Sequence, residues 1–134
     1  MQTHNPKAIG EKSEAIVLAH LLRNNHVVLV PFGNNQRYDL VVDMGNGVFL
    51  RGQVKTGVYR NGCVRFHPCS KSGGGKSKHY RDQVEVFWVY CPELDKIYQV
   101  PVNDVGTNQA LLRVDPPIGG ATSGIRWAKD YEMP

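Results

Sequence analysis

Apolar and polar residues alternate along residues 39–44 and 48–55, with the two-residue period of a half-buried β-strand. The apolar positions share one parity: Leu40, Val42, Met44, Val48, Leu50 and Val54. The polar positions share the other: Asp39, Asp43, Arg51, Gln53 and Lys55. Because Gly45-Asn46-Gly47 separates the two segments, we predict a hairpin with a three-residue loop. Such a hairpin sets Asp39 across from Gln53, with Lys55 two residues further along.

The N-terminal segment has helical periodicity instead. Asn5-Pro6 is typical of an N-cap followed by proline at the first helical position, and Asn24-Asn25 marks an end, so we predict a helix to about Arg23. Glu14 falls at the edge of the apolar stripe that we expect on this helix, where it could face the sheet. Glu11 falls nearer the centre of the stripe, where it could be a second functional acid or a capping group. That stripe comprises Ala8, Ala15, Ala19 and Leu22, flanked by Ile9, Ile16 and Leu18.

Further apolar runs predict the remaining strands. We expect a buried strand over residues 27–30, a strand around Val64 and Phe66, a hairpin from residues 84–90 and 97–102, and a short strand over 110–114. Residues 79–83 could form a helical turn, and the Gly/Ser/Lys stretch 70–78 is expected to be mobile. One helix packed on a mixed sheet, an α/β (α+β) fold, is the architecture that this order supports.

Composition fits one globular domain spanning residues 1–134, with 41% hydrophobic and 9% aromatic residues. The chain has neither an eighteen-residue apolar run nor the pattern of a signal peptide, so we expect a cytoplasmic, nucleoid-associated protein without a membrane partner. Three cysteines without a CxxC pair speak against a disulfide framework. A zinc site can be drawn, but its ligand spacings are irregular: Cys63, His67, Cys69 and His79.

The charge of the chain is unevenly distributed. Residues 44–81 hold eight of the 16 basic residues and none of the 12 acidic ones, so this stretch predicts a polyanionic partner such as DNA. The expected carriers of phosphate contacts are Arg60, Arg65, Lys71, Lys76, Lys78 and Arg81, with His79 and Tyr80 beside them. The candidates for reading bases are Gln36, Arg37, Arg60, Asn61 and Arg65. The loop at 72–77 could become ordered on DNA or be a tip without a role.

The polar residues of the predicted hairpin suit metal-assisted cleavage of a phosphodiester. A divalent ion held by carboxylates can activate water and neutralise charge on the phosphate, and hard oxygen ligands favour Mg2+. Asp39 and Glu14 would supply carboxylates and Gln53 an amide oxygen, while Lys55 would orient the water or offset phosphate charge. Each of these residues alone is ordinary on a strand or helix surface, so the hypothesis depends on their conjunction.

These residues carry a family resemblance. Gly10-Glu11-Lys12-Ser13-Glu14, Asp39 after Gln36-Arg37-Tyr38, and Gln53-Val54-Lys55 resemble the core of the PD-(D/E)xK nucleases. The runs at 31–40, 90–98 and 124–131 are similar to the group I intron-associated homing endonucleases of that family. Gln53 stands where an acid is usual, and Tyr38 where the family name has proline.

The resemblance implies a restriction-endonuclease-like core, a mixed β-sheet with flanking helices. It also implies a sequence-specific, Mg2+-dependent DNA endonuclease of homing type, with Mn2+ as a substitute ion and no organic cofactor. Its site residues would be Glu14, Asp39, Gln53 and Lys55, with Glu14, Asp39 and Gln53 on the metal. Such enzymes act on double-stranded DNA as homodimers or homotetramers, and residues 84–90 and 125–127 could contribute to an interface.

Other functions stay open at this point. A restriction enzyme or a Holliday junction resolvase would share the same core. Gln53 also leaves room for a non-catalytic DNA-binding protein of the same fold, because a neutral ligand binds metal more weakly than an acid does. An RNA-binding domain is disfavoured, because its aromatic residues are scattered along the basic stretch rather than interleaved with basic ones.

Overall fold

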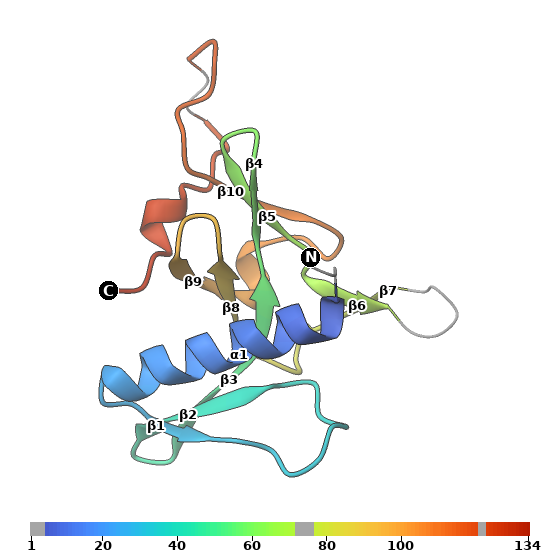
Figure 1. The fold of residues 1–134 in the computed structure, drawn as a ribbon, viewed down its shortest axis with the longest axis vertical. Coiled ribbons are helices and arrows are strands. Elements are labelled where there is room, and N and C mark those ends of the chain that lie inside the picture. The colour runs from blue at the N-terminus through green and yellow to red at the C-terminus, as the bar shows by residue number, and fades with distance from the viewer. Residues whose placement is uncertain (1–4, 72–76, 121–122) are drawn as a thin grey trace.

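The computed structural model describes residues 5–71, 77–120 and 123–134 (Figure 1). Its single named α-helix in these ranges is α1, Pro6–Arg23. The strands are β1 (Val27–Leu29), β2 (Leu40–Gly45), β3 (Val48–Thr56), β4 (Val58–Arg60), β5 (Cys63–Phe66), β6 (Cys69–Lys71), β7 (Ser77–His79), β8 (Val86–Cys91), β9 (Lys96–Pro101) and β10 (Ala110–Arg113). Two short 3-10 turns complete the fold, η1 (Val102–Asp104) and η2 (Ala128–Asp130).

The main sheet has five strands in the order β1-β2-β3-β8-β9. β3 and β8 are parallel and the other neighbours are antiparallel, so the sheet is mixed, as the sequence predicted. A second sheet has the order β10-β5-β4, and β6 pairs with β7 as a separate hairpin. The α+β fold is therefore confirmed, and on the face opposite α1 the strands β8 and β9 pack against the second sheet rather than against another helix.

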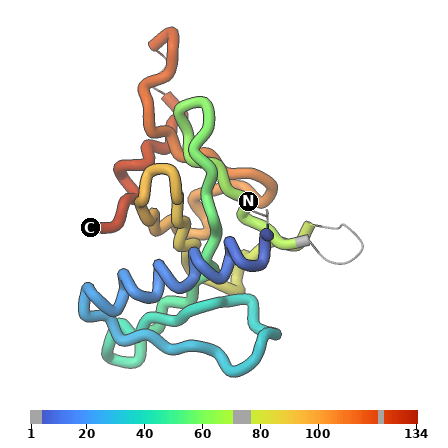
Figure 2. Tube along the Cα trace, viewed as in Figure 1, coloured from blue at the N-terminus to red at the C-terminus, as the bar shows by residue number. Residues whose placement is uncertain are grey.

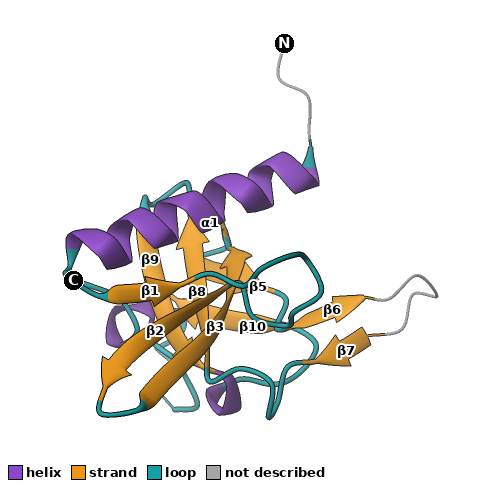
Figure 3. Cartoon of the chain, turned by 90° about the horizontal axis from the view of Figure 1, so that it is seen from below, coloured by secondary structure: helices purple, strands orange, loops and turns teal. Residues whose placement is uncertain are grey.

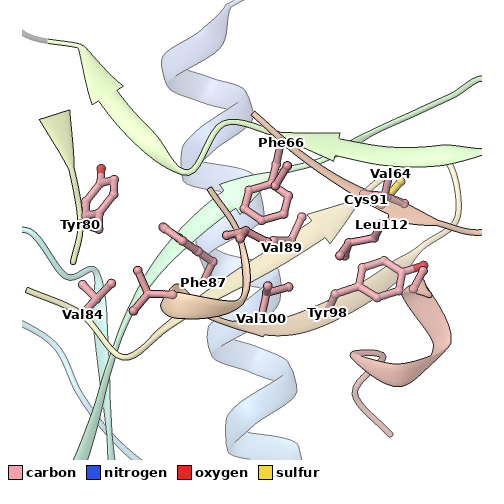
Figure 4. Close-up of a cluster of buried hydrophobic side chains, with 14 residues drawn as sticks. Val64, Phe66, Tyr80, Val84, Phe87, Val89, Cys91, Tyr98, Val100 and Leu112 are labelled. Atoms are coloured by element: carbon pink, nitrogen blue, oxygen red, sulfur yellow. The ribbon is translucent and has the colours of Figure 1, made fainter. Parts of the chain in front are cut away.

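Two hydrophobic cores lie on opposite sides of the main sheet. On one side α1 lies across the strands (Figure 3) and buries Val17 and Leu21 against Trp88 of β8. On the other side Phe87 and Val89 of β8 pack with the second sheet (Figure 4). All six residues of β8 are buried, which explains its unbroken apolar run. The prediction that residues 84–90 contribute to a subunit interface is wrong, because this strand is the centre of the molecule.

The predicted ends of α1 are confirmed, but its buried face is not the predicted one. Asn5 Oδ1 accepts hydrogen bonds from the amides of Lys7 and Ala8, and Asn24 follows the last turn. The buried residues are Ser13, Val17 and Leu21, whereas Ala8, Ala15, Ala19 and Leu22 are exposed. Glu11 is exposed as well, so the prediction that it lies near the centre of the buried arc is wrong. The predicted stripe depended on three alanines and on Leu22 near the end of the helix. Larger side chains have more apolar area to bury, so alanines are a weak guide to the buried face of a helix.

The predicted hairpin is confirmed with a tighter turn. β2 and β3 pair from Leu40↔Gly52 to Asp43↔Phe49, and the turn has two residues, Asn46 and Gly47, both with positive φ. A register shift between Asp43 and Gly45 absorbs the third residue of the predicted loop.

Several other elements differ from the prediction. β1 is an edge strand with Val27 and Leu29 exposed, so the expectation of a buried strand is wrong. The turn-rich stretch after Gly57 contains β4, β6 and β7 in addition to β5. Most of the expected mobile stretch, residues 72–76, lies outside the described residues. The β8–β9 hairpin and β10 follow the predicted positions, and residues 79–83 form one hydrogen-bonded turn.

The chain ends beside α1 (Figure 2), where Met133 packs against the core beneath the helix. Within the ranges that the structure describes, no helix is long and apolar enough to cross a membrane.

Candidate active site

The candidate site is a notch in the main sheet, at the place where β2 begins. β2 and β3 are last paired at Leu40↔Gly52, while β3 continues to Thr56 with only β8 as its neighbour. Residues 53–56 of β3 therefore have an edge that no β2 residue covers. Asp39, which directly precedes β2, lies at the corner of this notch.

Backbone hydrogen bonds fix Asp39 in the notch. Its amide donates to the Gly52 carbonyl at 2.9 Å, and its Oδ2 accepts from the Val54 amide at 2.9 Å. The Asp39 carboxylate thus provides a hydrogen-bond acceptor for the Val54 amide of β3, which lies beyond the last residue pair of β2 and β3. One carboxylate oxygen is held in place by this bond, so the position of the group is set by the sheet itself.

A buried polar contact brings α1 to the same notch. Ser13 is 2% exposed, and its Oγ lies 2.6 Å from Oγ1 of Thr56, the last residue of β3. The next residue of the helix is Glu14, which lines a cleft of about 480 Å³ together with Asp39. The other cleft residues come from the segment between β1 and β2, among them Pro31, Asn34, Gln36 and Tyr38. The Ser13–Thr56 contact therefore places a second carboxylate beside Asp39.

Lys55 reaches the site from the opposite side of β3. Gln53 and Lys55 alternate with Val54, which belongs to the core under α1, so both face away from the helix. Lys55 Nζ donates to the Cys69 carbonyl of β6 at 3.0 Å and lies 4.8 Å from the centre of the Tyr80 ring. Asp39 thus lies between Glu14 on one side and Lys55 on the other.

Burial and mutual charge perturb all three ionisable groups. Burial raises the pKa of Glu14, and the charges of Asp39 and Glu11 raise it further. Burial also raises the pKa of Asp39, although the Val54 amide and the Lys55 ammonium oppose this. The pKa of Lys55 is lowered, chiefly by burial. Two partly desolvated carboxylates that repel each other would both gain from a cation between them.

The donor set fits a hard divalent ion and does not fit zinc. The cleft offers the carboxylates of Glu14 and Asp39, oxygen ligands that suit an ion such as Mg2+, which keeps several of its waters, and Gln53 lies on β3 across from Asp39. No group of three or more His, Cys, Asp or Glu side chains gathers in the described parts of the chain. The candidate zinc set does not assemble there, since Cys63 Sγ instead accepts from Arg113 Nη1 at 3.2 Å.

The predicted DNA-contacting residues lie on three segments. Gln36 is exposed and lines the cleft. Arg60 and Asn61 are exposed at the β4–β5 turn, where Asn61 has a φ of 53°, and Arg65 is half-buried in β5. Lys78 and His79 are exposed on β7, and Arg81 is exposed just after it. Lys71 is the last residue of β6, and Lys76 lies outside the described residues. In Figure 1 the β4–β5 turn and the β6–β7 hairpin extend in different directions.

Arg37, predicted to read bases, bonds within the protein. Its guanidinium donates to four acceptors, on residues 70, 78, 79 and 83. Sequence reasoning also missed Ser13 and the Cys69 carbonyl as parts of the site. No sequence signal identifies a backbone carbonyl as an acceptor, whereas a serine on the inner face of a helix invites a search for a partner.

Comparisons with known proteins identify the family and the fold of this chain. The family model described as PD-(D/E)XK endonuclease matches residues 4–134, nearly the whole chain. The fold is similar to the solved structure of a bacterial homing endonuclease, I-Ssp6803I, with a TM-score of 0.75 and 21% identity. That likeness covers 96% of this chain and 89% of the other. A search of curated proteins found no match. The resemblance noted in the sequence is thus confirmed: the chain belongs to the PD-(D/E)XK endonuclease family.

Proposed function

We propose that this protein is a sequence-specific, Mg2+-dependent endonuclease of homing type that hydrolyses phosphodiester bonds of double-stranded DNA. The observation that carries the proposal is the position of Asp39, between the Glu14 carboxylate and the Lys55 ammonium at an open edge of β3. Endonucleases of this family generally use divalent metal ions, and Mn2+ would be the natural substitute. The likeness of the fold to a bacterial homing endonuclease favours the homing type.

In this mechanism each residue of the site has a separate task. Asp39, Glu14 and the Gln53 amide would hold the ion, and Asp39 keeps one oxygen on the Val54 amide while it does so. When bound, the ion supplies an activated water and offsets negative charge on the phosphate. The Lys55 ammonium lies near enough to Asp39 for the two charges to interact, and it would bind a nonbridging phosphate oxygen or orient the attacking water.

DNA binding would be supported by the basic stretch from residue 44 to residue 81. Lys78 and His79 are exposed on β7, where Arg37 holds their backbone carbonyls, and are our candidates for phosphate contacts. Gln36 borders the cleft and is our candidate for base readout near the cut. A genomic DNA target would place the protein in the cytoplasm with the nucleoid.

We further propose a homodimer or homotetramer, because two strands need two cuts and each chain carries one site. An exposed sheet face on β1–β3, away from α1, could form the contact with a second copy. Val27, Asp43 and Phe49 are cross-strand neighbours on it, and Val27 and Phe49 are 61% and 49% exposed. Apolar sheet residues of this kind at an edge are typical of an interface between chains.

Incubation with a randomised duplex library and Mg2+, followed by sequencing of the cut ends, tests the proposal. We expect cuts at one long sequence, and none with Asp39→Ala or Lys55→Ala. Parallel assays on supercoiled plasmid and on four-way junctions separate the other nucleases of this fold, since a resolvase would cut only the junction. Selective DNA binding with no cleavage in any of these assays would overturn the enzymatic proposal in favour of a non-catalytic DNA-binding protein, for which Gln53 is the best argument.

A further inference from the structure

We propose that Arg37 is a positioning residue that sets the location of the Lys55 ammonium through the β6–β7 hairpin and the Tyr80 ring. This inference rests on the proposed endonuclease function and extends it to a residue that does not itself meet the substrate. Arg37 lies two residues before Asp39, in the segment that lines the cleft. Its guanidinium turns away from that cleft toward the hairpin.

The contacts of Arg37 tie three separate segments together. Nε donates to Gln83 Oε1 at 2.6 Å, and Nη1 donates to Ser70 Oγ at 2.5 Å. Nη2 donates to the carbonyls of Lys78 at 3.2 Å and His79 at 2.8 Å. One side chain thus fastens both strands of the β6–β7 hairpin, and the turn that follows them, to the segment before β2.

Lys55 depends on the same hairpin. Its Nζ donates to the carbonyl of Cys69, the residue next to the Ser70 that Arg37 holds. The two cations therefore contact consecutive residues of β6. A shift of β6 that follows the loss of Arg37 would move the acceptor of the Lys55 ammonium directly.

Tyr80 provides a second connection between the two cations. The Arg37 guanidinium carbon lies 3.8 Å from the centre of the Tyr80 ring, and Lys55 Nζ lies 4.8 Å from it. The ring is 4% exposed and packs edge-on against Phe87 of β8 at 5.6 Å. The aromatic face attracts both positive charges and holds them near each other despite their repulsion.

The arrangement also links DNA contact to chemistry. The hairpin that carries Lys78 and His79 on β7 supplies the carbonyl that holds Lys55 from β6. If the exposed side chains of this hairpin bind a phosphate, Arg37 would fix the position of that phosphate relative to the Lys55 ammonium. A displacement of about 1 Å in such a group can cost about a hundredfold in rate.

The test compares Arg37→Gln with Arg113→Gln under single-turnover conditions, on a duplex recovered from the library selection. Arg113 is the matched control, because it also makes internal bonds, to Cys63 Sγ and the Asp115 carbonyl, but lies in the second sheet. We expect Arg37→Gln to lower the cleavage rate about a hundredfold, with DNA affinity without Mg2+ within about threefold of wild type. Arg113→Gln should leave both values close to wild type.

Milder variants keep the test valid if Arg37→Gln does not fold. Ser70→Ala removes one acceptor of Arg37 and should lower the rate several-fold at unchanged affinity. Tyr80→Phe keeps the aromatic face and should cleave nearly as wild type does, whereas Tyr80→Leu should lose most of the cleavage rate.

Three outcomes would contradict the inference. Parallel losses of affinity and rate in Arg37→Gln would make Arg37 a direct DNA contact. A folded Arg37→Gln or Ser70→Ala variant that cleaves as fast as wild type would overturn the inference alone. A folded wild-type protein that binds DNA and never cuts it would overturn the proposed function, and this inference with it.

Discussion

Asp39→Asn should separate the stability of this protein from its activity. The substitution keeps the size of the side chain and leaves an oxygen that can accept from the Val54 amide, so the backbone contacts of the notch survive. It removes a negative charge from a place where burial raises the pKa of Asp39 and a second carboxylate, Glu14, lies nearby. The fold therefore disfavours the ionised form that the proposed chemistry needs.

The sign of the stability change follows from that raised pKa. A carboxyl whose folded-state pKa is raised contributes stability at low pH, and this contribution is lost as the pH rises through the folded-state value. Without metal, we therefore expect Asp39→Asn to be at least as stable as wild type at pH 8, and any difference to vanish below about pH 4, the ordinary pKa of an aspartate. For 134 residues, a change of about 1 kcal/mol in stability shifts Tm by about 4 °C, which thermal unfolding resolves.

Mg2+ should reverse this order. At ten times its Kd, an ion that binds only the folded protein stabilises it by about 1.4 kcal/mol, and Asp39→Asn should lose most of this gain. Cleavage should fall about a thousandfold, since an ion contributes several kcal/mol to the transition state and about 4 kcal/mol corresponds to that factor. Asp130→Asn, at an exposed position in η2 away from the site, should change neither quantity.

Thermal unfolding with and without Mg2+, at pH 4 and pH 8, together with single-turnover cleavage, measures all of these effects. The reasoning would be refuted if Asp39→Asn lost more than about 2 kcal/mol of stability at pH 8 without metal, because the carboxylate would then be a structural ion-pair partner. Cleavage within tenfold of wild type would equally exclude Asp39 from the site.

Three further predictions follow from the packing. Gly52→Ala should destabilise the fold by about 1–3 kcal/mol in denaturant unfolding, because its Cβ would lie 2.2 Å from the Trp88 ring; an unchanged midpoint would show that the ring can move. Ser13→Ala should cost about 1–2 kcal/mol and slow cleavage, because it releases Thr56 from the middle of α1, where Glu14 lies, whereas Thr56→Ser should retain both stability and cleavage. Phe49→Lys should lower the mass seen by analytical ultracentrifugation, and an oligomer that persists would place the interface elsewhere.

The β-hairpin could be predicted from the sequence because its signal is local. Alternation with a period of two, joined to a turn rich in Gly and Asn, fixes which residues share a face and which lie opposite each other. This pattern places Asp39 and Gln53 near each other, and the pairing of Leu40 with Gly52 agrees. The extra residue of the predicted loop is absorbed by an irregularity near Met44 and does not disturb the register at the other end of the strands.

The parts that could not be predicted depend on tertiary contacts. The sequence does not reveal the buried face of α1 because alanines and larger apolar residues occupy several faces of the helix, and only the sheet below selects Ser13, Val17 and Leu21. β1 has the composition of a buried strand, but it lies at the edge of the sheet, a property that its own residues do not encode. Arginine is the best base reader, which favours a DNA contact for Arg37, whereas its acceptors lie 33 to 46 residues away along the chain.

Charge balance gives a reason for glutamine at position 53. The notch already holds the carboxylates of Asp39 and Glu14, and burial raises the pKa of both. A third carboxylate at position 53 would raise both values further, because like charges disfavour each other's ionisation. The Gln53 amide would add a ligand oxygen without that cost, at the expense of weaker attraction for the ion. The gain in Mg2+ affinity from Gln53→Glu should therefore grow as the pH rises and the acids of the notch ionise, and a gain that does not depend on pH would contradict this account.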